Sequence, residues 1–185
     1  MAETAPRHAT YHDLQALPDH VTGEILAGEL VATPRPSRRH SFAASHLGGG
    51  LVPPYGLGRG GPGGWVILVE PELGLGEDIL VPDLAGWKRE RFPREEADNW
   101  ISVAPDWVCE ILSPSTFRKD RITKMAIYAR HGVPYAWYLD PGNRTLECFQ
   151  LGGGVWALMG TWIDDDRVRA APFQEVAIDL GTLWL

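Results

Sequence analysis

Apolar and polar positions along the chain predict a series of short strands with helices between them. The run from 24 to 31 turns around Ala27 and Gly28, and it is typical of two strands joined by a tight turn. Further strand-like runs are rich in β-branched and aromatic residues, and they lie at 65–70, 79–87, 107–112, 135–140 and 145–151. A loop centred on Gly153, a run at 155–159 and a closing strand or two should follow.

Three helices are expected among these strands. Thr10 can cap a short helix, Tyr11 to Leu17, that Pro18 ends. Ser41 to Leu51 should form a second helix, which the glycines at 48–50 terminate. The third helix is capped by Ser115 or Thr116 and ends at Gly132, and its apolar stripe, expected to face the core, contains Ile122, Met125, Ala126 and Ala129. The pattern predicts an α/β (α+β) fold, a mixed β-sheet flanked by helices, in a single domain.

Length and composition support one domain. The chain has 185 residues, of which 44% are hydrophobic and 22% charged, as in ordinary globular proteins. We expect residues 1–20 to form an N-terminal segment with a short helix and residues 21–185 to form the domain. Cys109 and Cys148 lie in strand-like runs without the spacing of a zinc site, so they are expected to be small buried hydrophobic residues.

The net charge of −7 argues against tight, static binding to nucleic acid, which depends on Lys and Arg. A nucleic-acid partner would have to meet local positive charge, which is present at 35–40 and at 88–94. The N-terminus has no apolar core of a signal peptide, and no run approaches the ~20 apolar residues of a membrane span. A cytoplasmic protein with no membrane partner is therefore expected.

The glycine-rich segment 53–64 contains GxGxxG at Gly56, Gly58 and Gly61. This pattern cradles a dinucleotide only where it follows a strand and opens a helix. Here prolines precede it and the strand-like run at 65–70 follows it, so a flexible loop is expected.

Two acids lie inside apolar, strand-like runs, where an unpartnered carboxylate is unfavourable. They are Asp83 in VPDLAGW and Glu110 in PDWVCEILS. Side chains alternate along a strand, so Glu110 shares a face with Val108 and Leu112, and Asp83 is expected to share one with Val81 and Ala85. If the two strands are neighbours, both carboxylates can point to one hard cation such as Mg²⁺ or Mn²⁺, with the Ile111 carbonyl as a further ligand.

A lysine on the third predicted helix could lie close to the carboxylates of Asp83 and Glu110. Asp120, Lys124 and Tyr128 are spaced i, i+4, i+8, so they line one face beside the apolar stripe. Lys124 lies about two turns after the strand of Glu110, where its ammonium could orient a nucleophile and offset charge on a phosphate. As an exposed helix lysine, it would contribute little to stability.

Each of these residues also has a structural interpretation. Asp120 and Lys124 fit an exposed helix pair, and Glu110 fits a buried ion pair with an arginine. Asp83 could bond backbone amides at a strand edge. Asp106 fits the solvated start of a strand. The sequence leaves these alternatives open.

A family resemblance rests on the succession GELV, VPDLAGW, PDWVCEILSPST, D-x-x-x-K with a following tyrosine, and HGVPYAWYLDP. It resembles the Uma2 family of restriction-endonuclease-like proteins, also known as DUF820, over roughly residues 24–150. The family is assigned to the PD-(D/E)XK nuclease superfamily. The resemblance implies a mixed four- or five-stranded sheet flanked by helices, and Mg²⁺-dependent hydrolysis of phosphodiester bonds.

Carried over by position, Asp83 is the aspartate of the PD element and Glu110 the acid of the (D/E)XK element. Leu112 stands where the motif lysine is expected, and Lys124 is similar to a migrated equivalent. Glu29 in GELV is similar to the additional acid that superfamily members often take from an early element. In the implied mechanism, Arg38, Arg39 and His40 are candidates to hold the nucleic-acid backbone. Asp120 and Tyr128 are further candidates for contact with the substrate.

The function predicted is a Mg²⁺- or Mn²⁺-dependent DNA endonuclease that acts through a metal-activated water. A non-catalytic binding or scaffold protein on the same fold is the main alternative, since the chain is acidic and has no evident DNA-reading element. Hydrolysis of a smaller phosphoester is a third possibility. A homodimer is expected, because nuclease domains of this size often pair.

Overall fold

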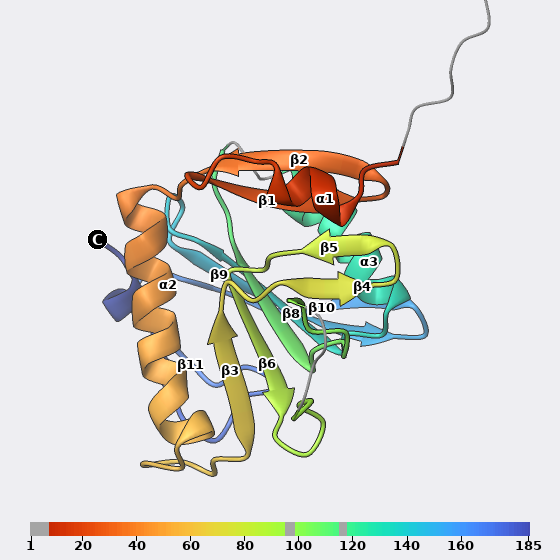
Figure 1. Cartoon of the computed structure of the whole chain (residues 1–185). Coiled ribbons are helices and arrows are strands. Elements are labelled where there is room, and N and C mark those ends of the chain that lie inside the picture. Colours follow the sequence, from red (N-terminus) through yellow and green to blue (C-terminus); the bar gives the residue numbers. More distant parts are fainter. Residues whose placement is uncertain (1–7, 95–98, 115–117) are drawn as a thin grey trace, which may run out of the picture.

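A mixed sheet forms the centre of the computed structural model, which describes residues 8–94, 99–114 and 118–185 (Figure 1). Within these residues its strand order is β10-β9-β8-β7-β6-β3, with β7 and β8 parallel and the other neighbours antiparallel. The strands are β3 (Trp65–Val69), β6 (Leu84–Lys88), β7 (Trp107–Ile111), β8 (Tyr135–Asp140), β9 (Thr145–Gly152) and β10 (Val155–Ile163). The predicted mixed sheet is confirmed, with six strands in the described part of the chain.

A second sheet packs against one face of the first, and its hairpin of β1 and β2 lies at the top of Figure 1. Its order is β2-β1-β5-β4, and its strands are β1 (Val21–Leu26), β2 (Glu29–Pro34), β4 (Leu73–Leu75) and β5 (Asp78–Leu80). The tight turn of the β1–β2 hairpin is confirmed: Ala27 and Gly28 have φ of 53° and 84°, the left-handed conformations that such a turn requires.

Helices cover both faces of the central sheet. The helix α2 (Arg38–Leu51) continues into the π-helical turn η1 (Val52–Gly56) and packs on one face, beside β3. The remaining elements are α1 (Tyr11–Gln15), η2 (Lys119–Lys124), α3 (Met125–Arg130), η3 (Leu180–Leu183) and the strand pair β11 (Arg167–Val168) and β12 (Ile178–Asp179). None of the described helices is long and apolar enough to cross a membrane.

The boundaries of α2 differ from the prediction. The helix begins at Arg38 because the Ser37 hydroxyl accepts the N–H of His40 and caps it. It also continues through the three glycines, which were expected to end it. Packing overrides their low helix propensity: Leu47, Gly48 and Leu51 are buried, and a Cβ on Gly48 would lie 3.3 Å from the Leu84 side chain. His40 therefore lies in the first turn of the helix.

The strand predicted at 79–87 is two strands. Pro82 lacks an N–H group for a sheet ladder, and the chain changes sheets between β5 and β6. Asp83 therefore lies directly before β6 rather than inside a strand, and the expected grouping with Val81 and Ala85 on one strand face is wrong.

The third helix has the predicted place and the predicted glycine end, with Gly132 at φ 71°. Its predicted cap, Ser115 or Thr116, lies outside the described residues. The predicted inner face is confirmed only in part: Met125 is buried, but Ile122 is 61% exposed and Ala126 is exposed. Asp120, Lys124 and Tyr128 are buried instead. The reason is electrostatic, since the buried Glu110 beneath the helix requires a cationic and hydrogen-bonding partner.

Two apolar clusters lie on the two faces of the central sheet. One contains Trp65, Trp107, Trp137 and Phe173 together with the inner side of α2. The other lies under the second sheet and α3 and contains Trp87, Val108, Leu112, Tyr128 and Tyr138. Cys109 and Cys148 are buried and free, as predicted.

Candidate active site

A pocket of about 310 Å³ lies where the β1–β2 hairpin, the start of α2, the end of β7 and η2 meet. Five carboxylates and four basic side chains line it: Glu24, Glu70, Asp83, Glu110 and Asp120, with Arg35, His40, Lys119 and Lys124. Glu24, Glu110, Asp120 and Lys124 are at most 3% exposed. The pocket is thus a polar interior enclosed by apolar packing.

Glu110 forms the deepest part of the site. β7 points its side chain toward η2 and α3, and Lys124 Nζ lies 2.8 Å and 2.9 Å from its two carboxylate oxygens. The Tyr128 hydroxyl donates to Oε1 at 2.5 Å. The alternative of an ion pair with an arginine is wrong, because the partner is a lysine. The alternative of an exposed Asp120–Lys124 pair is also wrong, since both side chains are buried.

Glu24 is an acid that the sequence interpretation missed. It projects from β1 and accepts the Val81 N–H at 2.9 Å and the Lys119 ammonium at 2.6 Å. Lys124 Nζ lies 3.0 Å from Glu24 Oε1, the oxygen that accepts the Val81 N–H, and it also donates to the Val81 carbonyl at 3.0 Å. Lys124 therefore links Glu24 and Glu110, which come from different sheets. Glu24 shares the signal that identified Glu110, an acid inside an apolar strand-like run.

Asp83 lies at the opening of the same pocket. Its Oδ2 accepts the Ile111 N–H at 2.5 Å, and its Oδ1 lies 2.9 Å from His40 Nε2. The antiparallel pairing of β6 with β7 places Asp83 beside the end of the strand that contains Glu110. The structure thus brings Asp83, Glu110 and Lys124 to one pocket.

Burial and charge determine the protonation of these groups. Burial raises the pKa of Glu110 to about 8, although Lys124 opposes the shift. Burial would also raise the pKa of Glu24, but the two lysines lower it below its ordinary value. For Lys124, burial acts to lower the pKa, but the surrounding carboxylates raise it above its ordinary value. Burial likewise opposes protonation of His40, whereas its bond to Asp83 raises its pKa.

Comparison with known protein families and solved structures shows which proteins share this sequence pattern and fold. The model of the Uma2 family, described as "Putative restriction endonuclease", matches residues 8–181. The chain belongs to the Uma2 family. Its fold is similar to the crystal structure of "a putative nuclease belonging to DUF820" from Anabaena variabilis, with a TM-score of 0.73. The two chains are 23% identical, and the match covers 95% of this chain and 97% of the other. Among curated proteins, none matches this chain.

The acids of this Uma2 chain fit a divalent cation in charge and in ligand type. Five carboxylates line the pocket with two lysines, one arginine and one histidine, so acids outnumber basic side chains there. Carboxylate and carbonyl oxygens are the ligands that Mg²⁺ and Mn²⁺ prefer. In the described part of the chain, no three His, Cys, Asp or Glu side chains are grouped closely enough to hold an ion. An ion shared by Asp83 and Glu110 would have to replace partners such as His40.

Glu29 does not lie with the other acids of the Uma2 site. It is exposed at the start of β2 and borders a separate cavity beside His8. It pairs with Leu26 across the hairpin turn, whereas Glu24 pairs with Val31. Of the two acids on this hairpin, Glu24 and not Glu29 lines the pocket, because Glu24 lies in the buried half of β1 whereas Glu29 is exposed beside the turn.

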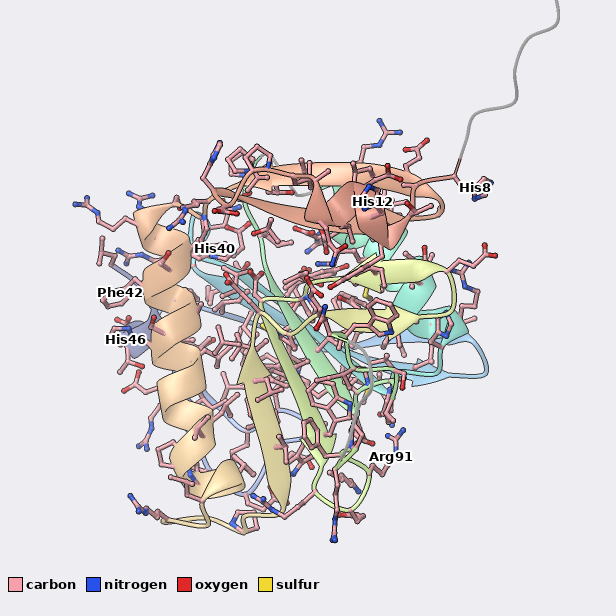
Figure 2. The ribbon with its side chains drawn as sticks, viewed as in Figure 1. His8, His12, His40, Phe42, His46 and Arg91 are labelled. Atoms are coloured by element: carbon pink, nitrogen blue, oxygen red, sulfur yellow. The ribbon has the colours of Figure 1, made fainter. Side chains whose placement is uncertain are left out.

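The two basic stretches differ in their contacts. Arg38 and Arg39 are exposed at the start of α2, outside the residues that line the pocket, whereas His40 points into it (Figure 2). In the other stretch, Arg89 donates to the carbonyls of Gly56 and Trp65, and Arg91 pairs with Asp106. Asp106 is buried, so its interpretation as a solvated strand start is wrong.

Proposed function

We propose that this chain is a divalent-metal-dependent endonuclease that hydrolyses phosphodiester bonds of DNA. One observation carries the proposal: buried acids from two different sheets converge with two lysines in one pocket, where acids outnumber basic side chains. Structural ion pairs alone would not need more acids than bases, because each uncompensated buried charge costs several kcal/mol, on the order of 3–5 kcal/mol when a partner is missing.

Asp83 and Glu110 would hold the ion, with Glu24 and the Ile111 carbonyl as further oxygen ligands. When bound, a divalent ion supplies Lewis-acid polarisation of the phosphate and a water of lowered pKa. The two lysines of the pocket have different roles. Lys124 keeps Glu24 and Glu110 in position through three short contacts. Lys119 is 17% exposed at the pocket, so it is the lysine better placed to contact a phosphate oxygen.

In this proposal Asp120 and Tyr128 do not contact the substrate. They orient or influence the charged side chains of the pocket. Tyr128 is fully buried and donates to Glu110, which orients that carboxylate. Asp120 lies 4.0 Å from Lys119 and adds to the negative charge that favours a cation. His40, which contacts Asp83, would have to release that carboxylate to an ion. The cytoplasmic location, the homodimer and the division at residue 20 stay predictions.

Calorimetric titration with Mn²⁺ or Mg²⁺, together with cleavage of single- and double-stranded DNA, tests the proposal. We expect Asp83→Asn and Glu24→Gln each to lower cleavage by at least about 100-fold, since loss of a ligand should exceed loss of an outer-shell partner. Glu29→Gln is the matched control, an acid on the same hairpin outside the pocket, and it should cleave like the natural chain.

A different pair of results would sink the nuclease proposal. If no ion binds at millimolar concentration and the double variant Asp83→Ala, Glu110→Ala is simply more stable, a binding or scaffold protein is the better conclusion. Cleavage of a small phosphodiester without cleavage of DNA would favour a smaller substrate.

A further inference from the structure

Positive charge is concentrated in one segment of this acidic chain. No Asp or Glu occurs between Glu29 and Glu70, a segment that contains four arginines, whereas the whole chain has a net charge of −7. Three of the four, Arg35, Arg38 and Arg39, lie at or just before the start of α2. This end of α2 is therefore the part of the surface to which a polyanion would be drawn.

Aromatic side chains follow the arginines along one side of α2. Arg39, Phe42 and His46 are spaced i, i+3, i+7, which places them in one row on a helix. The rings of Phe42 and His46 are stacked, with centroids 3.8 Å apart and planes at 22°. His46 Nδ1 lies 2.9 Å from the Phe42 carbonyl oxygen, which fixes the stack on the helix. Figure 2 shows both rings pointing away from the sheet, whereas His40 points toward it.

The row is continuous with the candidate active site. Arg35 and His40 line the pocket, and Arg38 and Arg39 follow at its edge. Arg35, Arg38, Arg39, Phe42 and His46 are here called the α2 strip. It runs from the mouth of the pocket along the outer side of the helix, so one strand of nucleic acid could contact both.

We infer that the α2 strip binds a single-stranded segment of DNA next to the bond that is cut, with phosphates on the arginines and a base stacked on the Phe42–His46 pair. The inference rests on the proposed nuclease function and adds its substrate class: DNA with unpaired nucleotides, such as an overhang, a flap or a gap. An aromatic platform recognises the face of a base, which is free only when the base is unpaired and unstacked. Arginines alone would fit duplex and single strand equally well.

Fluorescence anisotropy with labelled oligodeoxythymidylate of about 16 nucleotides measures this binding without catalysis, in the absence of divalent ions. A duplex of equal length is the comparison. We expect Phe42→Ala to weaken single-strand binding at least about five-fold, the loss that corresponds to one stacked base. Its affinity for the duplex should not change. The double variant Arg38→Gln, Arg39→Gln should weaken binding to both and lower the salt dependence by about 0.7 per lost phosphate contact on the single strand.

Two matched controls separate the strip from general surface effects. Leu57→Ala removes an apolar side chain that is 58% exposed outside the strip, and Arg167→Gln removes an exposed arginine on β11. Neither should change single-strand affinity. Equal loss of duplex and single-strand binding in Phe42→Ala would overturn the inference. So would an unchanged affinity in that variant, or no single-strand binding by the natural chain.

Cleavage is measured separately with Mn²⁺, on a duplex with a single-stranded overhang and on a fully paired duplex. If both are cut equally well, the nuclease proposal stands and the α2 strip inference fails. If the strip binds single strands but neither substrate is cut, the failure lies in the proposed function.

Discussion

The two faces of β7 are built from alternate residues of one short strand, and only one of them contains a charged side chain. Trp107, Cys109 and Ile111 join a cluster of aromatic and aliphatic side chains. On that face Phe173 lies 4.9 Å from the ring of Trp107 and 5.6 Å from that of Trp137. The opposite face contains Glu110, whose oxygens contact Lys124 and Tyr128.

This difference shows how a small domain can bury charge. The apolar face supplies hydrophobic stabilisation through large side chains that need few hydrogen bonds. The other face is stable only if each charged group finds a partner, because an unpaired charge in a low-dielectric interior is costly. A polar substitution on the apolar face should therefore lower the stability of the fold. On the charged face, the loss of a charged partner should do so.

Removing the lysine should have the largest effect on stability. Lys124→Ala leaves Glu24 and Glu110 buried without their shared cation, and it should lower the free energy of unfolding by about 3–5 kcal/mol. Urea denaturation measures this loss. This expectation replaces the one for an exposed helix lysine, because Lys124 is 1% exposed.

The matched variant is Lys124→Met, which keeps most of the volume and should cost nearly as much. Adding Glu24→Gln to it should restore part of the stability, because the lowered pKa keeps Glu24 ionised and the amide removes that charge. A loss below about 1 kcal/mol in Lys124→Ala would contradict the ion-pair interpretation of this face.

On the apolar face of β7, the introduction of a polar atom should lower the stability. Cys109→Ser places a hydroxyl among apolar side chains at nearly constant volume, and it should cost about 1–3 kcal/mol if the hydroxyl finds no partner. Cys109→Ala removes the sulfur without adding a polar atom and should cost less. Urea denaturation of both variants tests this order. If Cys109→Ser were as stable as the natural chain, the cost of burying a polar group would not explain the difference between the two faces.

A pH dependence is also expected for the charged face. The ordinary pKa of Glu is 4.5, and burial raises that of Glu110 to about 8, so between these values the folded chain holds a proton that the unfolded chain has released. The free energy of unfolding should therefore fall as the pH rises from about 5 to about 8. Melting temperatures across this range should show less of this fall in Glu110→Gln.

Glu24→Gln is the opposite-sign control for that series. The pKa of Glu24 is lowered, so its stabilising contribution is present above the ordinary carboxyl pKa and is lost as the pH falls through the lowered value. It should not change the slope between about pH 5 and pH 8. Equal slopes in the natural chain and in Glu110→Gln would show that Glu110 is ionised throughout this range.

The sequence alone identified several residues of the candidate active site. An acid within an apolar run identified Glu110, and the Ala27–Gly28 turn identified the hairpin beside it. Spacing correctly placed Asp120, Lys124 and Tyr128 on one side of a helix, but of the apolar stripe predicted to face inward, Met125 is buried whereas Ile122 and Ala126 are exposed. Periodicity gives the grouping of residues on a helix, and the neighbouring elements decide which group is buried.

Local patterns in the sequence therefore determined the alternation of β7, the mixed sheet and the pairing of acids with a lysine, since each depends on backbone geometry over a few residues. Only the tertiary structure decided that Glu24 rather than Glu29 joins the pocket and that the polar side of η2 and α3 faces inward. These choices depend on how two sheets pack, and buried charges must find partners across that contact, which no short segment of sequence specifies.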